Sequence, residues 1–227
     1  MVAGVDATIE TEEIRFHANF AEPLFRLHKD AWLLQQSCFR ALQDKGFAPS
    51  DFRLETPNIL VGNCLRQRVL FRVDEMRLEI VCSDAVGLVY DELEAIAVVL
   101  AEAVQGFVGL EWRLESFLIS VTSRWQVTLA QSNPLEIFPV VFTPLREMLR
   151  FDSELVGAGL AFTYGPVGPR RLCSVAVDGF VGGLQTRIQT LWDGALEAPR
   201  IIELARKSTM ELLERLDLRQ MFPGSLP

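Results

Sequence analysis

The sequence has few residues of the kinds from which metal and redox sites are built. It contains only two histidines, His17 and His28, and no Cys-x-x-Cys pair. Metal centres need clustered histidine, cysteine or carboxylate ligands, so we expect no metal and no cofactor. The four cysteines are widely spaced along the chain: Cys38, Cys64, Cys82 and Cys173. Because each lies in an apolar helical or strand-like context, we expect buried thiols outside any disulfide.

Catalytic motifs are also missing. The chain contains no Gly-x-Ser-x-Gly elbow and no glycine-rich phosphate loop before Lys-Ser or Lys-Thr. Gly157-Ala158-Gly159 is followed by a strand-like pattern instead of a helix, so it does not fit a dinucleotide fingerprint. Asp178 precedes Gly179 and is interpreted as a turn residue. We therefore name no catalytic residue, and the sequence favours a protein that is not an enzyme without excluding an enzyme.

No hydrophobic run is long enough to cross a membrane. The longest, Ala95 to Ala101, is far shorter than the roughly 20 residues that a spanning helix needs. The first residues lack both the basic start and the apolar run of a signal peptide. We therefore expect a cytoplasmic protein that does not insert into a membrane.

Lysine is scarce, and the net charge is negative. Of 22 basic residues only Lys29, Lys45 and Lys207 are lysines, and the formal net charge is −8. Binding to nucleic acid through bulk electrostatics depends on neutralising phosphates, which an acidic chain does poorly. Nucleic acid is therefore disfavoured as a partner unless a local basic face binds it.

A candidate basic face lies in the segment Leu65 to Cys82, which reads as a two-stranded hairpin around the polar pair Asp74-Glu75. Side chains alternate across a strand, so the apolar residues of each strand share one parity and the arginines take the other. The candidate binding residues are Arg66, Arg68, Arg72 and Arg77. The alternative is that these guanidiniums are solvated or paired with Glu79 and nearby helix carboxylates.

Hydrophobic spacing predicts four helices: residues 23–45, 91–105, 134–150 and 198–218. Gly46 and Gly106 are expected to end the first two. The remaining segments have the alternation of strands, among them Ile14 to Phe20. Residues 111–130 are predicted to form two strands around Thr122-Ser123. The pair Asp178-Gly179 is the strongest signal for a tight turn between strands.

The two halves repeat one order of elements: strand, helix, several meandering strands, helix. The pair Pro23-Leu24 that opens the first helix recurs as Pro134-Leu135. We therefore predict an α+β fold, in which a duplicated strand-helix-meander-helix unit forms a mostly antiparallel sheet with about four helices packed on one side. The repeats are residues 11–130 and 131–227, packed as one compact body. This order resembles the topology of saddle proteins such as the TATA-binding protein, and the resemblance implies a shared sheet with helices on its convex side but no function.

Three hypotheses for function remain. The first is a non-enzymatic protein-interaction module, a subunit of a cytoplasmic bacterial complex that uses its sheet face or exposed helices. The second is recognition of nucleic acid or nucleotide through the arginine hairpin. The third is a small-molecule-binding protein or enzyme with a pocket between sheet and helices. The partners expected are another protein or further copies of the chain.

Overall fold

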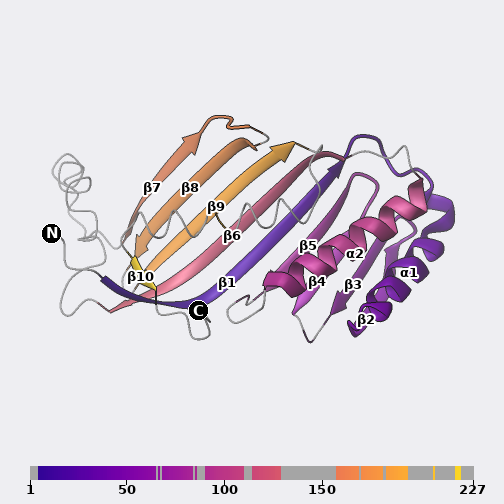
Figure 1. Ribbon diagram of the computed structural model, residues 1–227, viewed down its shortest axis with the longest axis horizontal. Helices are drawn as coiled ribbons and strands as arrows, with labels where there is room; N and C mark the ends of the chain where they lie inside the picture. The colour runs from indigo at the N-terminus through magenta and orange to yellow at the C-terminus, as the bar shows by residue number, and fades with distance from the viewer. Residues whose placement is uncertain are drawn as a thin grey trace.

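One antiparallel sheet dominates the computed structural model (Figure 1). The structure describes residues 5–64, 66, 68–83, 85, 90–109, 114–128, 157–168, 170–180, 183–193, 207 and 218–220. Within these ranges ten strands form a single sheet in the order β2-β3-β4-β5-β1-β6-β9-β8-β7, and β10 pairs with β1. All pairings are antiparallel except the one between β1 and β10.

Residues 5–128 supply β1 (Val5–Phe20), β2 (Pro49–Thr56), β3 (Ile59–Cys64), β4 (Val69–Val73), β5 (Arg77–Ser83) and β6 (Leu114–Thr128). Residues 157–220 supply β7 (Gly157–Tyr164), β8 (Arg170–Phe180), β9 (Gly183–Asp193) and β10 (Leu218–Gln220). The two helices within the described ranges are α1 (Leu27–Asp44) and α2 (Tyr90–Val108).

Strand β1 joins the two halves of the sheet. One of its edges pairs with β5 over Glu13 to Asn19, and the other pairs with β6 almost from end to end. Strand β6 then pairs with β9, so strands from the beginning, the middle and the C-terminal part of the sequence lie side by side (Figure 1). A strand that is paired on both edges has its backbone polar groups satisfied by its neighbours, and β1 is therefore the structural centre of the fold.

The helices form because their apolar residues recur at helical spacing. In α1 the buried positions are Leu27, Ala31, Leu34, Cys38 and Leu42, which form one stripe along the helix. The chain leaves this helix through Gly46, whose φ of 83° is readily adopted only by glycine.

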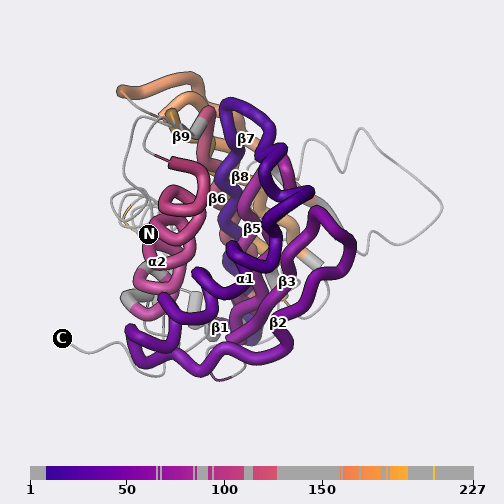
Figure 2. The backbone as a smooth tube through the Cα atoms, turned by 90° about the vertical axis from the view of Figure 1, so that its right-hand side faces the viewer, coloured from indigo at the N-terminus to yellow at the C-terminus, as the bar shows by residue number. Residues whose placement is uncertain are grey.

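Helix α2 has a more apolar sequence and packs beside α1 over the half of the sheet formed by β2 to β5 (Figures 1 and 2). It passes through Gly106 and ends before Gly109, which has a φ of 113°. No helix in the described ranges combines the length and the apolar character needed to span a membrane.

The core lies between these helices and one face of the sheet. Across the strands, the residues directly opposite one another on this face are Phe16, Ile80, Phe71 and Ile119, all nearly excluded from solvent. The ring of Phe16 packs against that of Phe117 with centroids 5.5 Å apart. Each of these strands thus buries every second residue, as strand alternation requires. The buried residues on this face are even-numbered in β1 and β5 and odd-numbered in β6.

The predicted α+β fold with four helices and a duplicated unit is wrong. The molecule is mainly one large antiparallel sheet, and its described residues contain only two helices. The first strand is also longer than predicted: β1 extends from Val5 to Phe20, whereas the sequence indicated a strand only from Ile14. The predicted helices at 134–150 and 198–218 lie outside the described residues, apart from Lys207 and β10.

Two predicted breaks are also absent. Thr122-Ser123 lies inside β6, which is one strand of 15 residues instead of two. Asp178-Gly179 lies inside β8, where Asp178 faces Gln185 and Gly159 on the neighbouring strands. Regular pairing along long neighbouring strands outweighs the local turn preference of these pairs. The hairpin loop predicted at residues 165–170 is confirmed, with Val167 bridging to Arg170.

Candidate functional site

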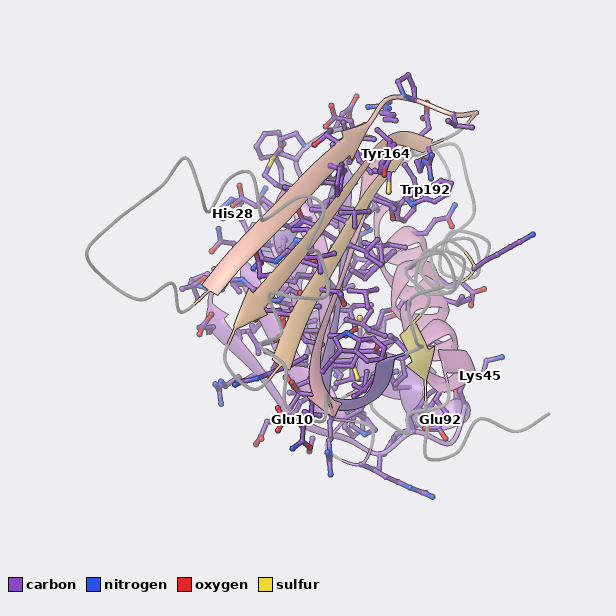
Figure 3. All side chains as sticks on the ribbon, turned by 90° about the vertical axis from the view of Figure 1, so that its left-hand side faces the viewer. Glu10, His28, Lys45, Glu92, Tyr164 and Trp192 are labelled. Carbon is purple, nitrogen blue, oxygen red and sulfur yellow. The ribbon has the colours of Figure 1, made fainter. Side chains whose placement is uncertain are left out.

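The face of the sheet opposite α1 and α2 is a candidate surface, and no described helix covers it. We call it the open face. Strand pairing places the following residues on it: Arg15, His17, Asn19, Leu70, Arg72, Arg77, Glu79, Val81, Ser116, Leu118, Ser120, Leu172, Ser174, Gln189 and Leu191. Side chains project from both sides of the sheet (Figure 3). The open face therefore mixes leucine and valine with small polar and charged residues, of which Ser116 and Ser120 are buried, with 7% and 8% of their surface exposed.

Charged residues line up across the half of the open face nearest the hairpin. Arg72, Glu79 and His17 are direct cross-strand neighbours on β4, β5 and β1. The His17 Nε2 atom lies 3.5 Å from Glu79 Oε1, and both side chains are only 19% exposed. Opposite charges on adjacent strands favour this register and fix the side chains in place.

Burial dominates the chemistry of His17. Loss of solvent lowers the pKa of the imidazole below its ordinary 6.5, against the opposing effect of Glu79. Nearby Arg77 and Arg15 lower this pKa further. At neutral pH His17 is therefore an uncharged hydrogen-bonding group beside Glu79 and not a cation.

The depressed pKa makes stability depend on pH with a definite sign. The unfolded chain binds a proton near pH 6.5, whereas folded His17 takes it up only at lower pH, so protonation favours unfolding. The stabilisation is complete above the unfolded pKa and is lost as pH falls through the folded pKa. We expect urea midpoints between about pH 8 and pH 5 to fall more steeply for the wild-type protein than for His17→Gln. Equal slopes would contradict this, since His28 is present in both proteins.

The structure brings together two of the four predicted arginines. Arg72 and Arg77 both lie near Asp74 in the hairpin turn, with Arg77 Nε 3.6 Å and Arg72 Nε 4.0 Å from its Oδ2 atom. Arg72 Nη1 also lies 3.6 Å from Glu55 Oε2. Asp74 itself is positioned by accepting hydrogen bonds from the backbone N–H groups of Met76 and Arg77. These two arginines thus lie near carboxylates of the hairpin turn and of β2, whereas the sequence suggested pairing with Glu79 and with helix carboxylates.

Arg66 and Arg68 lie at the other end of the hairpin. Arg66 is exposed in the link between β3 and β4, and exposed Arg68 precedes β4 with a φ of 53°. Four residues of extended chain separate Arg68 from Arg72, which is roughly 13 Å at strand spacing. The buried alternation predicted for β4 is present, with Val69, Phe71 and Val73 packed inward. The four arginines are nevertheless divided between two ends of the hairpin.

We call the face of the sheet that packs against α1 and α2 the covered face. It contains a buried polar group that the sequence did not indicate. Glu12 is 6% exposed and accepts a hydrogen bond of 3.0 Å from Ser123 Oγ. Nearby, Trp125 Nε1 donates to Thr186 Oγ1 at 3.0 Å. Hydrogen bonds of this kind offset the cost of burying polar atoms. No local signal identifies Glu12, because the residues that surround it come from a strand more than 100 positions away.

All four cysteines are buried, and none is part of a disulfide. Burial raises the pKa of the Cys38 thiol to about 12, and that of Cys64 and Cys82 to about 11, from an ordinary 9.0. Glu12 adds to the rise at Cys82, whereas Arg68 opposes it. The pKa of Cys173 is raised by burial as well.

Thiol chemistry provides a test of this packing. Because the thiolate is the reactive form, a rise of two pKa units lowers the thiolate fraction at neutral pH by about 100-fold, and burial also blocks access of the reagent. We expect the native protein to show no fast-reacting thiol towards an aromatic disulfide reagent, and all four to react once it is unfolded in guanidinium. A fast-reacting native thiol would show that at least one of these cysteines is accessible.

The titratable residues do not gather into a metal site in the described part of the chain. No group of three or more His, Cys, Asp or Glu side chains there is arranged to hold a metal ion. The two histidines are apart: His17 faces Glu79 on the sheet, while His28 Nε2 at the start of α1 lies 2.5 Å from Glu75 Oε1.

No protein-family model matches the chain, and no curated protein matches it. Among solved structures it is similar to TBP of Methanococcus jannaschii, with 11% sequence identity, coverage of 93% of this chain and 98% of that one, and a TM-score of 0.31. A TM-score this low supports neither a shared fold nor a shared function.

Proposed function

We propose that this chain is a non-enzymatic protein-interaction module, a subunit of a cytoplasmic bacterial complex, and that its open face is the binding surface. The observation that carries the proposal is a row of leucines across that face. Leu118, Leu191 and Leu172 stand directly opposite one another on β6, β9 and β8, and Leu172 is 39% exposed. Exposed apolar residues rimmed by polar ones are typical of protein interfaces.

The ion pairs on strands β1, β8 and β9 favour a protein partner over nucleic acid. Guanidiniums are matched with carboxylates: Arg15 Nε lies 2.6 Å from Glu13 Oε1, and Arg171 Nη2 lies 3.5 Å from Asp193 Oδ2. Pairing of this kind cancels the positive potential that binding to phosphates requires. The formal net charge of −8 acts in the same direction.

Matched variants test the surface. Leu172→Asp and Leu70→Asp place a charge on the open face at positions that are 39% and 46% exposed, so neither enters the core. Trp32→Asp does the same on α1, where the side chain is 52% exposed. In affinity purification with quantitative mass spectrometry, we expect a partner retained by the wild-type protein to be lost from both open-face variants and kept by Trp32→Asp. Loss from Trp32→Asp alone would place binding on the helix side and refute the open face.

Recognition of nucleic acid or nucleotide is the second candidate, and one observation favours it. The Nε atom of Arg72 is buried on the open face and makes no hydrogen bond. A phosphate oxygen is a suitable acceptor for this donor once the Arg72 side chain turns outward, away from Asp74. Gel shifts at low and moderate salt with the wild-type chain and a variant carrying alanine at Arg66, Arg68, Arg72 and Arg77 test this candidate. It predicts binding that the four substitutions abolish; no binding, or equal binding by both proteins, contradicts it.

A further inference from the structure

One end of the described sheet is a strand whose sequence does not oppose pairing with a further strand. Strand β7, with the sequence GAGLAFTY, pairs only with β8 among the described residues and forms one end of the sheet (Figure 1). It contains no charged residue and no proline, and its residues from Ala161 to Tyr164 are exposed. An edge of this kind presents unpaired backbone N–H and C=O groups to another strand.

The opposite end of the sheet is protected. Strand β2 carries Asp51, Arg53 and Glu55, and Asp51 has a φ of 50°. Its pairing with β3 is interrupted by two register shifts, whereas β7 pairs with β8 without any. Charges and irregular backbone are the usual devices that prevent edge-to-edge association. Only β7 among the two edges is suited to accept a further strand.

The apolar layer of the covered face extends to this edge. Phe162 lies opposite Val175 and Tyr164 lies opposite Cys173, and both β8 partners are buried. The two aromatic side chains are themselves 48% exposed. A strand added beside β7 would cover them and continue the layer, which gives an apolar gain besides the backbone hydrogen bonds.

We propose that β7 pairs antiparallel with β7 of a second copy of this chain, around a two-fold axis at Ala161. Antiparallel pairing of this strand with itself sets a larger residue against a smaller one at two positions, Tyr164 against Ala158 and Thr163 against Gly159. Antiparallel register about Ala161 sets Phe162 against Leu160 of the second copy, and Tyr164 against Ala158 of the second copy. No like charges meet in this arrangement.

This pairing closes after two copies. A two-fold axis uses the β7 edge of both chains, and in the described part of the chain the far end of each sheet is the protected β2 strand. The product is a dimer with one continuous sheet and not an open-ended fibre. This dimer does not depend on the open face binding a partner, so each proposal can fail without the other.

Light scattering after size-exclusion chromatography tests the dimer. Over a concentration series we expect the wild-type mass to approach twice the chain mass of 25.5 kDa. Ala161→Asp sets two carboxylates directly against each other at the axis, on an exposed position outside the core. Like charges in contact cost several kcal/mol, so we expect self-association at least about 100-fold weaker.

A charge swap makes the test specific. Ala161→Lys alone is also expected to be monomeric, whereas an equimolar mixture of Ala161→Asp and Ala161→Lys should return to the dimer mass, because opposite charges then face each other. Leu54→Asp on β2 is the matched control and should remain dimeric; circular dichroism confirms that each variant is folded. A wild-type monomer at every concentration, a dimer that persists in Ala161→Asp, or a mixture that stays monomeric would each overturn the proposal.

Discussion

Replacement of Phe16 by alanine is expected to lower the free energy of unfolding by about 3–5 kcal/mol, the range for removal of a buried aromatic ring. Phe16 is 3% exposed on β1, opposite Ile80 on one side and Ile119 on the other. Its ring also contacts Phe117 of β6. The cavity would therefore open where the two parts of the sheet meet, and both would lose stability together.

Denaturant unfolding followed by two probes measures this effect. Tryptophan fluorescence reports on α1, β6 and β9 through Trp32, Trp125 and Trp192, while far-ultraviolet circular dichroism reports on the whole chain. We expect coincident transitions that shift together in Phe16→Ala. Leu70→Ala, on the exposed side of β4, is the control and should cost less than about 1 kcal/mol. Separate transitions for the two probes would show that β1 does not unite the halves.

Substitution of Gly62 by alanine is expected to destabilise the protein by about 1–3 kcal/mol through overpacking. A Cβ atom at this position would lie 2.8 Å from Phe71 Cε1 and 3.0 Å from Phe52 Cδ2. These rings cannot easily retreat, because Phe71, Phe52 and Phe39 pack edge to face in a row with centroids 5.0 and 5.4 Å apart. Thermal or denaturant unfolding gives the change in free energy directly.

Two further variants make the Gly62 test specific. Phe71→Leu removes the ring that the new methyl group would meet, so we expect Gly62→Ala to cost less in the Phe71→Leu background than alone. Gly106→Ala is the matched control, since it lies within α2 and has no neighbour within 4 Å of the added Cβ. It should stabilise the protein by about 0.5–1 kcal/mol. Equal costs of Gly62→Ala in both backgrounds would contradict the ring contact.

Local patterns predicted the elements whose signals are local. The sequence predicts a first helix over residues 23–45, and α1 spans Leu27–Asp44 with the predicted exit glycine; Leu27, Leu34, Cys38 and Leu42 are buried as expected, but Trp32 is 52% exposed. The inward parity of β4 was predicted by strand alternation in the same way. These features depend on the period of side chains within one element, which the sequence displays directly.

Features that depend on distant partners were not predictable. The N-terminal part of β1 is a strand because β6, more than 100 residues away, pairs with it, and nothing in residues 5–13 signals that partner. The same holds for Glu12, which meets Ser123 only in the folded sheet. The pairing of His17 with Glu79 likewise follows from the β1–β5 register and not from a motif. Tertiary pairing also overrode the turn signal at Asp178-Gly179.

The central claim is that one sheet runs through both halves of the chain with one packed face and one open face. Single introduced cysteines test it most directly, because the four native cysteines are buried. On β4 and β6 the pairs are Leu70→Cys against Val69→Cys, and Thr122→Cys against Val121→Cys. We predict fast labelling of the native protein at Leu70→Cys and Thr122→Cys and none at Val69→Cys or Val121→Cys. Labelling at Val69→Cys and Val121→Cys, or protection of Leu70→Cys and Thr122→Cys in the isolated protein, would contradict the account.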